Sequence, residues 1–272
     1  MTAHPLVTRR MMLRDMGKAG FAVMILGTAA CTRDPTENAT PSIDPETTAT
    51  SDAATSTTGS AGSSPSTAGG TGGGYEWRRV NLSFVSAYIL YRGGEAVVVD
   101  TGVGGSEGDI EAGLGEVGLA WGDVGALIVT HLHPDHQGSV TAVVEATSDV
   151  PWFAGTGDID GIGAPTEGQA VGDDDTVHSG LQIIETPGHT PGHISVLDPV
   201  SGVLVAGDAL NGADGGVAGP NPDFSQDMGL ANASVAKLAA FDYEVALFGH
   251  GEPVLEAASG RVADLAESLE GS

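Results

Sequence analysis

The fold of this 272-residue chain is decided by the stretch Thr130-His131-Leu132-His133-Pro134-Asp135-His136. Three imidazoles and one carboxylate fall within its last six residues. The preceding run Ala126–Thr130 is apolar and β-branched, which predicts a buried strand that opens into a loop at this cluster. In extended backbone, side chains two residues apart face the same way, so His131 and His133 can hold one cation. Asp135 and His136, which come after Pro134, then turn toward a second cation. A site made of imidazoles and carboxylates suits zinc, manganese or iron.

Further ligand-type residues stand where other predicted strands end. His189 follows a predicted strand at 181–185, Asp208 follows one at 203–206, and His250 follows one at 245–248. The residues sort into two ligand sets with one bridging member between them. The first set is His131, His133 and His189, the second is Asp135, His136 and His250, and the bridge is Asp208. Two cations about 3.5–4 Å apart trap a hydroxide between them and lower the pKa of the water, so no other general base is needed.

These motifs resemble those of the metallo-β-lactamase superfamily of hydrolases over roughly Trp77 to Leu269. The matching segments are His131 to His136, Val98-Val99-Asp100-Thr101-Gly102, Thr186-Pro187-Gly188-His189-Thr190-Pro191-Gly192-His193, Gly207-Asp208 and Phe248-Gly249-His250-Gly251. The resemblance implies an α/β fold: a four-layer αββα sandwich of two mixed β-sheets flanked by helices, with the metals at one edge of the sheets. It also implies two Zn²⁺ ions, with Mn²⁺ or Fe²⁺ as alternatives.

Within this superfamily, the residue at 208 favours one branch over others. True β-lactamases commonly have cysteine or serine there, whereas an aspartate is more similar to the glyoxalase II, lactonase and phosphodiesterase branches. A glutathione thioester is disfavoured because Arg261 is the only basic residue after His250. We assign catalysis to Asp135 and Asp208, and expect Asp100 and His193 to act as outer groups that orient the ligands rather than as ligands themselves.

The charge balance excludes several classes of partner. The chain has 10 basic and 36 acidic residues and a net charge of -26, which repels nucleic acid and anionic lipid surfaces. Its single cysteine, Cys31, excludes an internal disulfide and a cysteine-based zinc knuckle. The expected partner is therefore a small-molecule substrate, with no nucleic acid; the pattern does not indicate an oligomeric state.

The N-terminal region predicts export. Residues 1–31 combine adjacent arginines with a short apolar segment and end at Cys31, typical of a twin-arginine and lipoprotein-like signal. Threonine at position 28 departs from the lipobox pattern, so simple cleavage without lipid stays open. Residues 32–74 are rich in Ser, Thr, Gly and Ala and predict a disordered linker, and residues 75–272 form the hydrolase domain. We expect an extracytoplasmic protein whose contact with the membrane is a lipid anchor on Cys31.

The local pattern gives a coarse order of elements. It predicts one strand over Val80–Tyr91, long loops at 155–172 and 211–224, and a helix over Ser139–Thr147 capped by Ser139. It also predicts helices at 109–119, 227–241 and 255–269, and a solvated His178 on the hairpin 176–185.

The leading interpretation is a dinuclear zinc hydrolase whose bridging hydroxide attacks a small ester, lactone or thioester. One alternative resembles the persulfide dioxygenases of the same fold, with a single iron at a site of the His131, His133 and Asp208 type. β-Lactam hydrolysis and an envelope protein that only binds a metal or small ligand are further alternatives.

Overall fold

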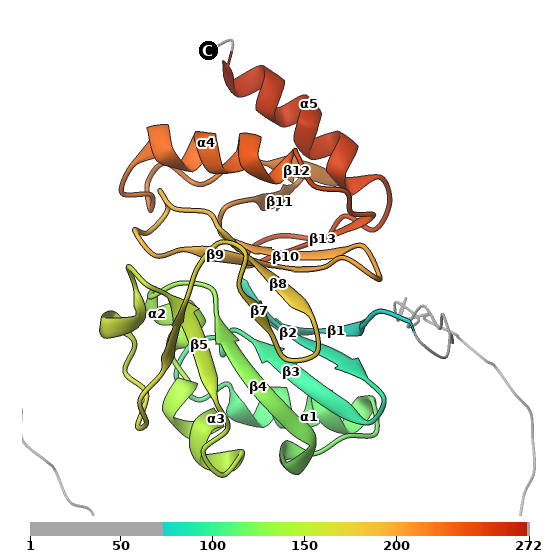
Figure 1. Ribbon diagram of the computed structural model, residues 1–272, viewed down its shortest axis with the longest axis vertical. Coiled ribbons are helices and arrows are strands. Elements are labelled where there is room, and N and C mark those ends of the chain that lie inside the picture. The colour runs from blue at the N-terminus through green and yellow to red at the C-terminus, as the bar shows by residue number, and fades with distance from the viewer. Residues whose placement is uncertain (1–72, 271–272) are drawn as a thin grey trace, which may run out of the picture. The chain divides into compact units, whose positions relative to one another are not determined.

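A computed structural model describes residues 73–270 of the chain. The expected export signal with Cys31, and the linker up to residue 72, lie outside the described residues. Two large β-sheets pack face to face, with helices on both outer faces (Figure 1). This is the four-layer αββα sandwich that the motifs implied. Among residues 73–270, no helix has the length and apolar character needed to cross a membrane.

The first sheet has six strands in sequential order, β1 to β6. Their bounds are Glu76–Leu82, Val85–Arg92, Glu95–Val99, Val124–Val129, Trp152–Gly155 and Gln169–Val171. The strands β1, β2 and β3 pair antiparallel, and the pairs from β3 to β6 are parallel. Parallel pairing points the carboxyl ends of β4 and β5 at one edge of the sheet, where the histidine cluster begins.

The second sheet has five strands in the order β13-β10-β9-β8-β7. Their bounds are Thr176–Val177 for β7, Leu181–Glu185 for β8, Ile194–Asp198 for β9, Val203–Gly207 for β10 and Val245–Phe248 for β13. The strands β10 and β13 are parallel, so Asp208 and His250, which follow them, emerge at the same edge. A separate hairpin is formed by β11, Asn211–Ala213, and β12, Gly216–Ala218.

Helices cover the outer face of each sheet (Figure 1). On the first sheet lie α1, Glu107–Glu116, and α3, Val140–Ala146, with the short α2, Pro134–Gln137, between β4 and α3. On the second lie α4, Met228–Leu238, and α5, Ala258–Glu270. Single 3₁₀ turns occur at Trp121–Asp123 and Ile159–Gly161.

Strand alternation divides the apolar side chains into three packed layers. Along β3, Val97 and Val99 face the space between the sheets, whereas Val98 packs toward the outer helices with Ile110 and Leu114. A third layer joins the second sheet to α4 and α5. Three apolar layers hold four layers of secondary structure together, and the polar loops are left to gather at the edge.

The structure corrects several local predictions. The run Val80–Tyr91 is two strands, because Ser83 turns the chain with φ of 77° and donates its N–H to Asn81 Oδ1. Ser139 precedes α3, but within the described residues its hydroxyl makes no capping bond to that helix; it donates to the Val103 carbonyl at 2.7 Å. The loop at 211–224 contains the β11–β12 hairpin, and the loop at 155–172 contains β6.

His178 is not solvated as predicted. Its Nδ1 lies 3.1 Å from the Tyr75 hydroxyl, and its side chain is 16% exposed. Gly125 leaves the space for its imidazole, since a Cβ there would meet His178 Nε2.

Candidate metal centre

Three imidazoles converge at the edge where the two sheets meet. His131 and His133 follow β4, and His189 lies in the loop after β8. His133 Nδ1 lies 3.1 Å from His131 Nε2 and 2.9 Å from His189 Nε2. A neutral imidazole has one lone pair and one N–H, so three convergent ring nitrogens cannot all satisfy one another. This first set is therefore arranged for a shared cation.

A second group lies beside the first and contains a carboxylate. Asp135 Oδ2 is 3.3 Å from His250 Nε2 and 3.9 Å from His136 Nε2. Within each set, the candidate ligand atoms all lie within 4.8 Å of one another. The structure thus brings Asp135, His136 and His250 together as the second set predicted from the sequence.

The Asp208 carboxylate lies between the two sets. Its Oδ1 is 3.3 Å from His136 Nε2, and its Oδ2 is 3.4 Å from His189 Nε2 and 3.3 Å from His250 Nε2. Gly207 makes this approach possible, because it has φ of 56° and a Cβ there would meet His193. One carboxylate therefore faces ligands of both sets.

Two buried atoms of this cluster test whether metal ions fit. His136 Nε2 and Asp208 Oδ1 are buried and make no hydrogen bond within the described part of the chain. Buried polar atoms without a partner are rare and costly, and a cation satisfies both at once. The donor set of imidazoles and carboxylates is the one zinc and related transition metals prefer. The residues present fit metal ions.

Outer hydrogen bonds fix the imidazoles of the second set. Asp100, at the end of β3, accepts from His136 Nδ1 at 2.8 Å and from the Thr130 backbone N–H at 2.7 Å. Its φ of 62° turns the carboxylate toward this loop, a conformation that aspartate tolerates better than most residues. His250 Nδ1 donates to the Phe84 carbonyl at 2.7 Å. Each bond leaves Nε2 facing the cluster.

Corresponding bonds orient the first set. His131 Nδ1 lies 3.0 Å from the Thr130 hydroxyl, and His189 Nδ1 lies 3.1 Å from the Ser225 hydroxyl. Sequence reasoning did not find Ser225, because it comes from a loop far along the chain. Its closeness to His189 depends on the tertiary fold.

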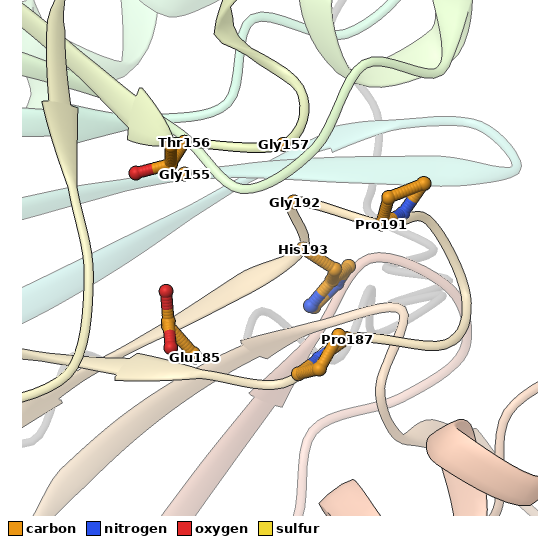
Figure 2. A pocket seen from close by; sticks show the side chains of 8 residues that line it. All are labelled: Gly155, Thr156, Gly157, Glu185, Pro187, Pro191, Gly192 and His193. Atoms are coloured by element: carbon orange, nitrogen blue, oxygen red, sulfur yellow. The ribbon is translucent and has the colours of Figure 1, made fainter.

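His193 does not point a free nitrogen at the cluster. Its Nε2 accepts from the Asp208 backbone N–H at 3.0 Å, so Nδ1 carries the proton and donates to the Thr186 hydroxyl at 2.8 Å. Burial lowers the pKa of His193 to about 3, which keeps the imidazole neutral and able to accept. Figure 2 shows its imidazole in the lining of a cavity of about 90 Å³ between the ends of β5 and β8. His193 thus holds the backbone of the residue that bridges the two sets.

Asp158 is an organising residue that the sequence analysis missed. It follows β5, is 1% exposed, and accepts from the Leu132 N–H at 3.0 Å, the Gly192 N–H at 2.7 Å and the Thr190 hydroxyl at 2.5 Å. These bonds tie the first histidine loop to the second. Its position soon after the end of β5 is a local signal, but Asp160 shares that signal.

The electrostatics differ between the imidazoles. Burial lowers the pKa of His131 well below its usual value and the pKa of His189 to about 4, which favours neutral rings. Burial also acts to lower the pKa of His136, but the Asp208 and Asp100 carboxylates outweigh it and raise the pKa well above the usual value. Hydrogen bonds to Asp135 and Asp208 raise the pKa of His250 to about 10. The second set thus attracts positive charge, whereas the first offers neutral lone pairs.

Comparisons with known proteins agree with this fold. The family model of the metallo-beta-lactamase superfamily matches residues 80–250. A protein described as a probable metallo-hydrolase, YflN of Bacillus subtilis, is 29% identical over 203 residues, which cover 58% of this chain and 76% of that protein. The crystal structure of a metallo-beta-lactamase family protein from Thermus thermophilus superposes with a TM-score of 0.58 at 24% identity, covering 73% of this chain and 78% of that one.

A hydroxyacylglutathione hydrolase of Dechloromonas aromatica is 31% identical over 141 residues. That alignment covers 49% of this chain and 49% of the relative, so the chain matches about half the length of that enzyme. An αββα fold with a histidine- and aspartate-rich centre at the sheet edge defines the class as a metal-dependent hydrolase. The chain belongs to the metallo-beta-lactamase superfamily.

Proposed function

We propose that this protein is a dinuclear zinc hydrolase that cleaves a small ester, lactone or thioester. The observation that carries the proposal is the position of the Asp208 carboxylate between the two ligand sets: its Oδ2 lies within 3.4 Å of His189 of the first set and of His250 of the second, and its Oδ1 lies 3.3 Å from His136. A single bound cation does not require a carboxylate that lies within contact distance of both ligand sets. When bound, a pair of such cations supplies Lewis acidity and a hydroxide nucleophile at neutral pH.

In this proposal each ligand set holds one cation. His131, His133 and His189 bind the first, Asp135, His136 and His250 bind the second, and Asp208 contributes to both. Asp135 is the more exposed of the two carboxylates, with 27% of its side chain accessible against 8% for Asp208. Substrate can therefore reach Asp135 directly. Asp208 is more buried, and its role would be to fix the separation of the two metal sites.

The remaining residues keep this arrangement in place before substrate arrives. Asp100 holds His136 with Nε2 toward the cluster, and His193 holds the Asp208 backbone. A rigid set of oriented donors needs no rearrangement during reaction, which is the main source of electrostatic catalysis.

The substrate class is supported by two observations. Relatives described as hydroxyacylglutathione hydrolases make a thioester a natural candidate for the bond cleaved. The alignment spans about half of those enzymes, so we carry over the bond type and not the glutathione carrier. The aspartate at 208 continues to favour this branch over β-lactam hydrolysis.

A second candidate is the iron-dependent oxygen chemistry considered from the sequence, with His136 in place of His133 in the group of three ligands. It is favoured by one observation: His131, His136 and Asp208 offer ligand atoms within 4.8 Å of one another. Two histidines and one carboxylate are the donor set of many non-haem iron oxygenases.

Metal analysis combined with activity assays separates these candidates. Protein purified without chelator is analysed for metals by mass spectrometry and assayed on a panel of esters, lactones and thioesters. Two zinc ions per chain and hydrolysis that is lost with chelator and restored by zinc support the proposal. One iron per chain with oxygen consumption on a persulfide, and no hydrolysis, contradicts it.

We also propose that the protein acts outside the cytoplasm, on the strength of residues 1–31 alone. Mass spectrometry of the membrane fraction tests this. A mature chain that begins at a lipidated Cys31 supports the proposal, and an unprocessed chain in the cytosolic fraction contradicts it.

A further inference from the structure

A few large apolar side chains are exposed on the surface, and some of them lie near the metal centre. Among residues 73–270, those more than half exposed are Phe84, Val200, Phe224, Leu230 and Leu255. Isolated exposed apolar residues are ordinary, so exposure alone indicates nothing. What distinguishes Phe84 and Phe224 is that each stands on a segment that is hydrogen-bonded to a histidine of the centre.

Phe84 borders the second ligand set. It occupies the β1–β2 turn, and its side chain is 60% exposed. Its carbonyl accepts from His250 Nδ1 at 2.7 Å, and its ring stacks near the His250 imidazole, with centroids 6.2 Å apart and planes 11° apart. The aromatic face therefore extends outward from the second set toward solvent.

Phe224 borders the first ligand set. It is 66% exposed, and the next residue, Ser225, lies 3.1 Å from His189 Nδ1. The Gln226 N–H also donates to the His189 carbonyl at 3.1 Å. Leu230 adds apolar surface from the first turn of α4, which packs against Gly188 in the same histidine loop.

The two aromatic residues approach the centre from different directions. His189 Nε2 and His250 Nε2 both lie within 3.4 Å of Asp208 Oδ2. Their Nδ1 atoms, on the other side of each ring, face the segments that carry Phe224 and Phe84. The segments that carry the two phenylalanines therefore lie on different sides of Asp208.

Charge around the centre restricts what these side chains can bind. The segments 81–86, 211–227 and 249–255 contain no lysine or arginine. Arg79, close to Phe84 in sequence, already donates to Ser86 Oγ, Glu252 Oε2 and the Gly251 carbonyl. An anionic carrier finds no unpaired cation from these segments, whereas an uncharged hydrocarbon chain finds aromatic surface.

We propose that Phe84 and Phe224 bind the uncharged, apolar acyl chain of the substrate and so make the enzyme selective for longer aliphatic acyl groups. This inference rests on the proposed hydrolysis and adds the substrate class to it. Both side chains act on specificity, through binding of the part of the substrate that does not react.

The test is a chain-length series with the zinc-loaded protein. We expect kcat/KM for p-nitrophenyl acetate, butyrate, hexanoate and octanoate to rise about two- to fourfold per methylene group. Phe84→Ala and Phe224→Ala should each lower the octanoate-to-acetate ratio, mainly through KM. Phe84→Leu should retain most of the ratio, because it keeps an apolar side chain.

Matched controls separate binding from damage to the centre. Val200→Ala removes an equally exposed apolar side chain from the β9–β10 turn, at the end of these strands away from Asp208, and should leave the ratio unchanged. The zinc content of Phe84→Ala should equal that of the wild type, since its carbonyl still accepts from His250. A wild type that hydrolyses acetate and octanoate equally well overturns the inference and leaves the proposed hydrolysis standing.

A direct binding measurement covers the case in which no ester, lactone or thioester is hydrolysed. The proposed function then fails, and calorimetry with octanoate and acetate tests the aromatic residues alone. Tighter binding of octanoate that is lost in the Phe84→Ala/Phe224→Ala double variant supports the inference, and equal binding of both acids overturns it. The exposed phenylalanines could instead contact a lipid surface or a second copy of the chain. The inference is therefore also overturned if the double variant loses vesicle binding or self-association while its octanoate-to-acetate ratio stays that of the wild type.

Discussion

The two ligand sets of the metal centre differ in burial and in charge. His131 and His189, in the first set, are 0% and 1% exposed, and burial lowers the pKa of each. In the second set, the Asp135 and His250 side chains are 27% and 31% exposed, and His250 has its pKa raised by two carboxylates. His133 in the first set is partly exposed and His136 in the second is fully buried, so the difference is one of degree. The first set is the more buried group, of neutral donors, and the second is the more open group, with negative charge.

The two sets are also held by different parts of the fold. Asp158 ties the two loops of the first set together through buried hydrogen bonds. His250 is held from the β1–β2 hairpin, by the Phe84 carbonyl and by the bond from the Ser86 N–H to the Gly249 carbonyl. In the proposed dinuclear centre, the first cation would be held at the edge of the core, whereas the second would depend partly on a surface turn, through His250, and partly on the buried pair of His136 and Asp100. We therefore expect the second cation to exchange faster and to be lost first.

Asp208→Ala tests the group that both sets share and should have the largest effect. It removes a ligand from each site. Misplacement of one catalytic group lowers the rate of hydrolysis by about 100-fold, so misplacement of both cations should lower it by on the order of 10⁴-fold. Zinc content should fall below two per chain, measured on the same samples as kcat. If this variant kept two zinc ions and near-normal turnover, Asp208 would not bridge the sets and our division of the ligands would be wrong.

His133→Ala tests the buried set alone. His133 Nδ1 contacts both other imidazoles of this set, so its loss should remove the zinc ion of the first set, leave at most about one zinc per chain, and lower kcat by at least about 100-fold. The sandwich should stay folded, because the residue lies at the sheet edge and outside the apolar layers. Circular dichroism checks the fold, and global unfolding of this variant would argue against a site that is separate from the core.

His250→Ala tests the open set. We expect about one zinc per chain to remain, held by the first set, with hydrolysis lowered by about 100-fold. His178→Ala is the matched control, since this imidazole lies at the β7–β8 turn, away from the centre, and should keep two zinc ions and normal turnover. Loss of both zinc ions from His250→Ala would mean that the two sets do not bind independently.

Asp100→Asn should have the smallest effect of the series. The carboxylate accepts from His136 Nδ1, so an amide disturbs the imidazole orientation without removing a ligand. Replacement of such an outer partner costs about 10- to 100-fold in metal affinity or activity. Zinc affinity of the second set should fall while that of the first stays unchanged, and Asp160→Asn, an exposed neighbour of Asp158, should alter neither. Equal weakening of both sets would remove the distinction between them.

The sequence predicted those parts of the centre that follow strands with a strong apolar pattern. His131, Asp208 and His250 each stand directly after such a strand, so topology alone brings them to one edge. Asp158 was missed because it lies in a glycine-rich loop that also contains Asp160, and local pattern does not tell which of the two carboxylates is buried.

Two other features depended on tertiary contacts. The turn at Ser83 lies between apolar residues and contains no glycine, so the hairpin that holds His250 was read as one strand. The bond from Ser225 to His189 joins segments 36 residues apart, and no local pattern encodes it. The fold class was accessible because the motifs are specific, whereas the outer groups that orient the ligands depend on how the loops pack.

Stepwise zinc titration of the metal-free protein, followed by calorimetry, tests the central claim most directly. We predict two binding events, a tight one at the first ligand set and a weaker one at the second. The weaker event should be absent in His250→Ala, and both should be weakened in Asp208→Ala. A single binding event of one zinc per chain in the wild type, or two events that Asp208→Ala leaves unchanged, would contradict it.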